Sequence, residues 1–239
     1  MHKVTIPLIA LLLLALSSPE LCAQPSTPPR PSASVTPTFA TGWIIHVYKA
    51  PDDLKQLPTD ALGSFIDTSG APYAFHLYKQ QPALAWYKGT PAYGFEGWLE
   101  AKQPGRHSLI LEVLLPHIEG KKAANINFAP ARVPTTTCRV VFQMEDATLI
   151  DQEIVAPFRP DGDGNLQTVL PSGVDLEPGF YRVKAWTACN AVLYNEENQT
   201  RGWRFHFDPT KVVLNIRLKR PPDAVAQPAT AADFLHQVK

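Results

Sequence analysis

Apolar and polar residues alternate through most of the chain between residues 42 and 218. Successive side chains of a β-strand point to opposite faces of a sheet, so this period of two predicts strands with one buried face. About ten such segments are separated by Pro, Gly, Asn and Asp residues, which are typical of turns. The pattern predicts an all-β fold, a single antiparallel β-sandwich or barrel.

Segment 93–115 shows this pattern most clearly. Every second residue is apolar or glycine over 95–101, and every second residue is apolar again over 109–115. Gln103, Pro104 and Gly105 lie between these two stretches. We interpret it as a β-hairpin. Segment 176–189 repeats the same order, with a Pro-Gly turn before a long alternating strand. Both segments are therefore expected to be scaffold.

Other strands are expected over 64–68, 73–79, 83–88 and 165–170. A second hairpin is expected from the strands at 138–144 and 148–155, which flank a Glu-Asp turn.

The N-terminus predicts export from the cytoplasm. Residues 1–23 have a polar start, an apolar run over 6–16 and a cleavage position before Gln24, as signal peptides do. The apolar run is shorter than the roughly 20 residues that cross a bilayer, so no transmembrane segment is expected in the mature chain. The predicted location is periplasmic or secreted.

Composition divides the rest of the chain into three parts. Residues 24–40 are rich in Pro, Ser and Thr without hydrophobic periodicity, which predicts an extended linker. Residues 41–220 form the predicted β-sandwich domain. Residues 221–239 return to Pro, Ala and polar residues and are expected to be a loose, flexible tail.

Two cysteines, Cys138 and Cys189, remain after removal of the signal. An even pair in an oxidising compartment predicts a disulfide bond. Each cysteine alternates in phase with apolar residues of its own strand, so both thiols are expected to face the core. A metal site or a reactive thiol is the alternative, but neither cysteine has a second Cys or a His at ligand spacing.

The net charge and the motifs argue against two classes of function, nucleic-acid binding and catalysis. Lys plus Arg equals Asp plus Glu at 22 each, so no net field attracts nucleic acid. The sequence has no Gly-x-Ser-x-Gly elbow, no His-Glu-x-x-His and no phosphate-binding glycine loop. We therefore expect no enzyme, although a pair of carboxylates for glycoside hydrolysis stays open because such partners meet only in space.

Asp161, Asp163 and Asn165 form a candidate calcium site. Oxygen-bearing side chains at alternate positions, with glycines between them, can converge on Ca²⁺. The segment is not an EF-hand, because Leu166 replaces the invariant glycine and Ser172 the bidentate glutamate. The alternative is an ordinary tight loop, which favours the same residue types. No other cofactor is expected.

Trp86, Tyr87 and Trp203 are candidate ligand-binding residues. Aromatic faces stack on the apolar face of a sugar ring, and nearby polar groups fix its orientation. Trp86 and Tyr87 stand in a short polar segment, and Trp203 follows a polar loop. The alternative is that the aromatic residues pack the interior of the sandwich.

Four segments resemble the PA14 family, a β-sandwich module of bacterial toxins, glycosidases and microbial adhesins. They are Gly42-Trp43 with Val47-Tyr48, then 95–113, 138–154 and 176–183. The resemblance implies a β-sandwich fold. Sugar-binding members hold calcium with a paired-aspartate motif after the central segment, where residues 114–122 here read LLPHIEGKK. No aspartate pair occurs in that segment, and the adjacent Asp52 and Asp53 lie far earlier, next to the first strand.

The leading hypothesis is an exported, non-catalytic module that binds a glycan or another cell-envelope ligand. The alternative is a structural accessory subunit of a surface assembly, such as a pilus or a secretion apparatus, whose partner is an envelope protein. We expect the functional residues in the long loops at 117–137, 159–165 and 195–202, which lie beside the scaffold strands.

Overall fold

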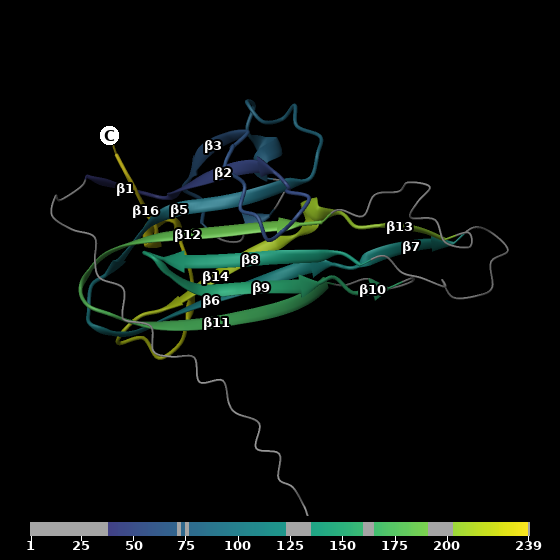
Figure 1. Cartoon of the computed structure of the whole chain (residues 1–239). Helices are drawn as coiled ribbons and strands as arrows, with labels where there is room; N and C mark the ends of the chain where they lie inside the picture. The colour runs from purple at the N-terminus through teal and green to yellow at the C-terminus, as the bar shows by residue number, and fades with distance from the viewer. Residues whose placement is uncertain are drawn as a thin grey trace, which may run out of the picture.

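The fold is a sandwich of two antiparallel sheets with a small third sheet at one end (Figure 1). The computed structural model describes residues 38–70, 73–74, 77–122, 135–159, 165–190 and 203–238. Over these residues the regular structure consists of strands and short 3₁₀ turns. The predicted all-β antiparallel sandwich is confirmed. None of the helical turns in this part of the chain has the length and apolar character needed to span a membrane.

The first sheet has eight strands. They are β1 (Phe39–Thr41), β2 (Trp43–Lys49), β3 (Gly63–Asp67), β5 (Pro91–Ala101), β8 (Thr137–Met144), β9 (Ala147–Val155), β12 (Gly179–Cys189) and β16 (Leu235–Gln237). Their order is β1-β16-β5-β12-β8-β9, and β2 pairs with both β5 and β3. Long β5 and β12 therefore lie at the centre of the sheet.

The second sheet has five strands and faces the first across the core. They are β4 (Tyr73–Ala74), β6 (Gly105–Pro116), β11 (Asn165–Leu176), β14 (Val213–Lys219) and β15 (Gln227–Pro228). The third sheet joins β7 (Ile118–Lys122), β10 (Phe158–Arg159) and β13 (Trp203–His206). Short 3₁₀ turns occupy Leu77–Gln80, Pro209–Lys211 and Ala231–Asp233.

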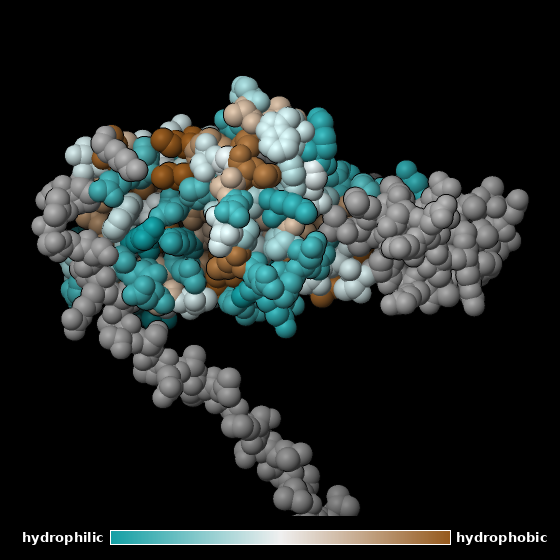
Figure 2. Space-filling view, turned by 45° about the horizontal axis from the view of Figure 1, so that its top comes forward, coloured by the Kyte–Doolittle hydropathy of each residue, from teal (hydrophilic) through white to brown (hydrophobic). Residues whose placement is uncertain are grey.

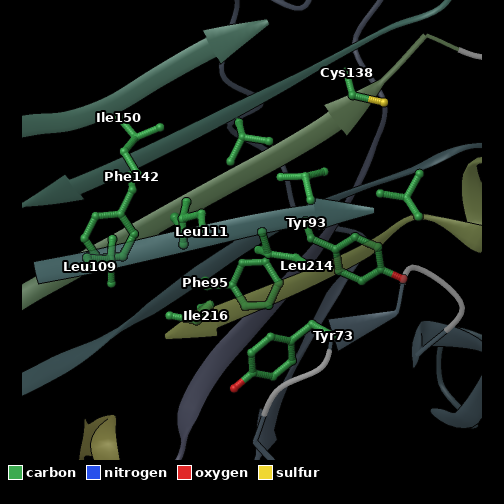
Figure 3. Packing of buried hydrophobic residues seen from close by; sticks show 14 of the residues in the cluster. Tyr73, Tyr93, Phe95, Leu109, Leu111, Cys138, Phe142, Ile150, Leu214 and Ile216 are labelled. Atoms are coloured by element: carbon green, nitrogen blue, oxygen red, sulfur yellow. The ribbon is translucent and has the colours of Figure 1, made fainter. Parts of the chain in front are cut away.

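The core is built from the inward phases of both sheets (Figure 3). Phe95 of β5 and Phe142 of β8 face Leu111 of β6, and all three are almost fully buried. Trp43 adds an aromatic cluster, because its indole stacks on the Phe234 ring at 4.1 Å between centroids and its N–H donates to the Tyr73 hydroxyl at 3.0 Å. The alternating pattern in the sequence thus corresponds to burial strand by strand.

The predicted hairpin at 93–115 is wrong, because β5 and β6 belong to different sheets. Strand β5 pairs with β12, β2 and β16, whereas β6 pairs with β11 and β14. The second Pro-Gly turn also crosses between the sheets, from β11 to β12. Ala101 is opposite Gly179 in one sheet and Gly105 is opposite Leu176 in the other, so the two crossings lie side by side. Gly105 has φ +125°, a conformation that favours glycine.

Other strand predictions have mixed outcomes. The second hairpin is confirmed: β8 pairs with β9 around Glu145, whose φ is +50°. The strand predicted at 64–68 corresponds to β3, and the one at 165–170 is the first half of β11. The strand predicted at 83–88 is wrong, because residues 82–86 form turns.

The disulfide between Cys138 and Cys189 is confirmed. The two residues are directly opposite each other in the pairing of β8 with β12, and neither is exposed to solvent. The bond therefore joins neighbouring strands of the first sheet at the core face.

The C-terminal residues 221–238 differ from the predicted loose tail. Strand β15 pairs with β14 of the second sheet, and β16 pairs with β1 and β5 of the first. Between them Phe234 is fully buried against Trp43. This segment is therefore part of the sandwich and links its two sheets, because burial of a few apolar residues outweighs its polar composition.

Candidate functional site

Three contiguous hollows lie on the outer face of the first sheet, with volumes of about 180, 420 and 530 Å³. We call them together the outer groove. Neighbouring hollows share lining residues, and polar and aromatic side chains supply most of the lining. Its principal residues are Ile44, His46, Tyr48, Leu57, Pro58, Gly94, Glu96, Trp98, Gln143, Glu145, Asp146, Arg182, Lys184, Trp186, His236 and Gln237. Figure 2 shows polar side chains with interspersed apolar ones on the side of the molecule where this sheet lies.

Strand register places the charged side chains of the groove in rows. Glu96 of β5 is opposite Lys184 of β12, which is opposite Gln143 of β8. One step along the strands, Trp98 is opposite Arg182. The intervening residues of each strand face the core, so the outward phase gathers these side chains on one surface.

Glu96 lies at the centre of a polar network. The Arg182 guanidinium donates to Oε1 of Glu96 through Nε at 3.0 Å and through Nη2. Nε2 of His46 is 3.7 Å from Oε2, while Nδ1 of the same ring is hydrogen-bonded to the Ser64 hydroxyl at 2.6 Å. Together His46 and Arg182 lower the pKa of Glu96 to about 2 against the opposing effect of burial. The carboxylate is therefore ionised and held in place.

Lys184 has no hydrogen bond or ion pair with any side chain of the described residues, in contrast to Arg182 beside it. Glu96 is opposite Lys184 across the strands, and the charge of Lys184 helps to lower the pKa of that carboxyl group, although Glu96 forms its hydrogen bonds with Arg182. The Lys184 side chain is exposed and lines two of the three hollows. An ammonium group is available to a ligand at this point.

Gly94 and Trp186 form the floor of the smallest hollow. A Cβ atom on Gly94 would lie 3.0 Å from the Tyr48 ring, so glycine makes room for that ring. Trp186 is 6% exposed and packs in a small apolar cluster with Leu54. Its buried indole N–H has no acceptor among the described residues.

One wall of the groove is the loop between β2 and β3. Leu57 of this loop lines the hollow and is 47% exposed. Arg139 of β8 fixes the loop by donating from Nη1 to the Leu54 carbonyl at 2.8 Å, and it holds Asp151 with two hydrogen bonds of 2.7 Å. These bonds lower the pKa of Asp151 and raise that of Arg139.

Two of the aromatic residues predicted to bind a ligand, Trp86 and Tyr87, do not line this groove. Trp86 is 62% exposed in a turn, where its indole N–H donates to the Ala83 carbonyl at 2.8 Å. Its ring meets Tyr87 edge-on at 5.9 Å, and the Tyr87 hydroxyl donates to the Thr90 carbonyl. Trp203 begins β13 of the third sheet. Ligand binding by these three residues stays a prediction.

The predicted calcium ligands Asp161 and Asp163 lie outside the described residues. Asn165 is described and is an exposed residue at the start of β11. No group of three or more His, Cys, Asp or Glu side chains suited to a metal ion occurs where the chain is described. Most of each loop predicted to carry function also lies outside this part, so those predictions stay open.

Sequence reasoning missed the outer groove because its residues come from five strands, β2, β5, β8, β12 and β16, that are distant along the chain. The sequence does indicate which side chains of each strand face outward, because they alternate with the buried apolar ones. Over 180–186, for example, Arg182 and Lys184 alternate with the buried Tyr181, Val183 and Ala185. Only the register of β12 against β5 shows that Glu96 joins them.

No protein-family model and no curated protein matches this sequence. Among solved structures, the PA14 domain of the antifreeze protein MpAFP is 8% identical, with 86% of this chain and 95% of that chain covered at a TM-score of 0.45. The A domain of epithelial adhesin 9 from Candida glabrata, in complex with Galb1-3GlcNAc, is 9% identical, with 88% and 97% covered at 0.44. The PA14 sugar-binding domain from an RTX adhesin is 12% identical, with 82% and 98% covered at 0.42.

The first and third of these structures are named as PA14 domains, the family that the sequence segments resemble, and the likeness is weak and divergent. Identities of 8–12% do not carry residue roles from those domains to this chain. We therefore base the function on the outer groove itself.

Proposed function

We propose that the protein is an exported, non-catalytic module that binds a glycan in the outer groove. The observation that carries this proposal is Glu96, a carboxylate fixed between His46 and Arg182 on the floor of an open groove. Fixed planar groups of this kind accept and donate hydrogen bonds to sugar hydroxyls without losing side-chain entropy on binding. Trp98, which lines two of the hollows, supplies an aromatic surface for a sugar ring.

The polar network also has the order serine, histidine and carboxylate that occurs in acyl-transfer enzymes. Its dimensions do not support that chemistry. The 3.7 Å separation between His46 and Glu96 is longer than a hydrogen bond, and the carboxylate is engaged by Arg182 instead of orienting the imidazole. We therefore assign Ser64 and His46 to the support of Glu96.

A glycan array with purified protein tests the proposal. We expect the wild type to bind at least one glycan class, and Glu96→Gln to weaken binding about tenfold by loss of the charge-assisted hydrogen bonds. Asp175→Asn is a matched control, because it removes an exposed carboxylate paired with Arg106 on the second sheet. Absence of binding to every glycan by the wild type, or equal binding by Glu96→Gln, would contradict the proposal.

Calcium at Asp161, Asp163 and Asn165 is a separate part of the proposal. If this loop holds Ca²⁺ that supports ligand binding, EDTA should weaken glycan binding and added Ca²⁺ should restore it. Asp161→Asn/Asp163→Asn should reproduce the effect of EDTA. Binding that is unchanged by EDTA would remove calcium from the proposed function while leaving the groove in place.

A further inference from the structure

The loop between β2 and β3, residues 50–62, is held to the sandwich at its two ends and at one point between them. Backbone hydrogen bonds hold the ends: Ala50 N–H to the Thr90 carbonyl at 2.9 Å and Leu62 N–H to the Val47 carbonyl at 2.7 Å. Within the described part of the chain, the hydrogen bond that joins residues 51–61 to the sandwich runs from Nη1 of Arg139 to the Leu54 carbonyl, at 2.8 Å. The middle of the loop therefore has one polar anchor.

The same residue of the loop supplies an apolar anchor. The Leu54 side chain is 6% exposed and packs with Ala92, Val141, Trp186 and Ala188. These four residues face outward from the first sheet, and their cluster is separate from the core between the two sheets. A small cluster of this kind can open locally while the sandwich stays folded.

Arg139 is oriented by a second residue. Its Nε and Nη2 each donate to a carboxylate oxygen of Asp151 at 2.7 Å, and its side chain is only 15% exposed. The guanidinium group is planar, so this double contact also fixes the direction in which Nη1 points. Arg139 therefore connects β9, through Asp151, with the middle of the loop.

The loop brings apolar side chains to the outer groove. Leu57 and Pro58 line its smallest hollow, together with the polar residues Glu96 and Gln143. Leu57 is 47% exposed, although it is a large apolar residue. A sugar ring has an apolar C–H face and a rim of hydroxyl groups. Contact with the Leu57 side chain would bury apolar surface on both partners, while the hydroxyl groups reach Glu96.

We infer that the β2–β3 loop is a wall against which a bound sugar packs through Leu57, and that Arg139 is the positioning residue that holds this wall. This inference rests on the proposed function and assigns two further residues to the same site. Leu57 contacts the sugar. Arg139 acts through the Leu54 carbonyl and is absent from the lining of the three hollows.

Limited digestion of the folded protein with trypsin tests the anchor without a ligand. Lys55 is exposed and is the one lysine or arginine in residues 50–62, and cleavage after it requires the loop to leave the sheet. We expect Arg139→Met to raise the rate of cleavage at this bond, measured by mass spectrometry, about tenfold through loss of the charge-assisted hydrogen bond. Arg106→Met, which breaks an exposed pair with Asp175 on the second sheet, should leave the rate unchanged.

Titration calorimetry tests the wall, with the array glycan that gives the strongest wild-type signal as the probe. We expect Arg139→Met and Leu57→Ser each to weaken binding about fivefold. Leu57→Ser should do so at the wild-type rate of cleavage, because it removes the contact and leaves the anchor. The double variant should bind about as weakly as either single one, since both act on the same contact. Val169→Ser, at a side chain 50% exposed on β11, should leave the affinity unchanged.

The outcomes separate this inference from the proposed function. Wild-type cleavage of Arg139→Met would show that Arg139 does not hold the loop. Faster cleavage with unchanged affinity would show that the loop is not part of the site. Either result overturns the inference while glycan binding at Glu96 stands. If the wild type binds no glycan of the array, the proposed function fails and the inference fails with it.

Discussion

Among single residues, Glu96 connects stability with the site. Its carboxylate joins β5 to His46 of β2 and to Arg182 of β12, so it ties three strands together on the outer face of the sheet. The same contacts keep it ionised, because they lower its pKa to about 2. A side chain that is held by protein contacts contributes to folding as well as to recognition.

This lowered pKa predicts a pH-dependent effect of Glu96→Gln. The folded pKa is below the ordinary value of 4.5, so the carboxylate stabilises the fold above about pH 5 and loses this contribution as the pH falls toward 2. We expect the variant to be less stable than wild type by about 1 kcal/mol at neutral pH, and the difference to vanish near pH 2. Urea unfolding across this range measures it.

Asp175→Asn is the control for this series. Its carboxylate pairs with Arg106 at an exposed position, so we expect a change within about 0.5 kcal/mol. A difference between wild type and Glu96→Gln that stays constant from pH 7 to pH 2 would show that the Glu96 contacts do not depend on its charge.

Among the elements, the C-terminal segment 221–238 has the largest effect for its length. It crosses from β15 in the second sheet to β16 in the first, and it covers Trp43 with Phe234. Its last strand also contributes His236 and Gln237 to the outer groove. The segment thus supports both the core and one end of the candidate site.

Phe234→Ala should therefore be strongly destabilising. Removal of a fully buried ring that stacks on Trp43 leaves a cavity, and we expect a loss of about 3–5 kcal/mol in the free energy of unfolding. Val225→Ala, at a side chain that is 60% exposed in the same segment, should change stability by less than about 0.5 kcal/mol. Equal, small effects of both substitutions in chemical denaturation would instead support a loose tail.

At the scale of the whole molecule, the two sheets are held together by chain crossings as well as by the core. The Pro-Gly crossings carry the chain from β5 to β6 and from β11 to β12, side by side at one end of the sandwich. The disulfide joins β8 and β12 within the first sheet. The crossings fix the two sheets relative to each other, and the disulfide reduces the conformational freedom of the unfolded chain.

The disulfide should account for a large part of the stability. Cys138 and Cys189 are 51 positions apart, and closure of a loop of this length is worth about 4 kcal/mol in the chain-entropy model. We expect Cys138→Ala/Cys189→Ala to unfold at markedly lower urea concentration than the oxidised wild type. The reduced wild type should behave like the variant. A loss below about 1 kcal/mol would show that the bond adds little to the folded state.

Much of the fold could be predicted from the sequence, because the alternation of apolar and polar residues along a strand shows which side chains are buried. Phe95 and Leu111 are at apolar positions of this alternation, and both are buried. Alternation does not report the partner of a strand. Two alternating strands joined by a Pro-Gly turn can pair as a hairpin within one sheet, or they can belong to two facing sheets. The alternation of apolar residues is the same in both cases. The hairpin prediction failed for this reason.

The candidate site was less predictable than the fold. Glu96 and Lys184 are 88 positions apart and meet only through the register of β5 and β12. Phe234 was missed for a related reason, since the few apolar residues of segment 221–238 show no period. Both depend on long-range contacts that no local pattern encodes.

The pairing of β1 with β16 determines how the domain responds to mechanical load. Phe39 is opposite Gln237, and the Val238 N–H donates to the Thr38 carbonyl, so both strands leave the sheet at the same point. A force that draws residues 38 and 238 apart therefore loads the hydrogen bonds between β1 and β16 one after another, in an unzipping geometry. The pair yields before the long central strands share the load, and β16 carries His236 of the groove with it. Tension on the chain should thus release a bound ligand before the sandwich unfolds.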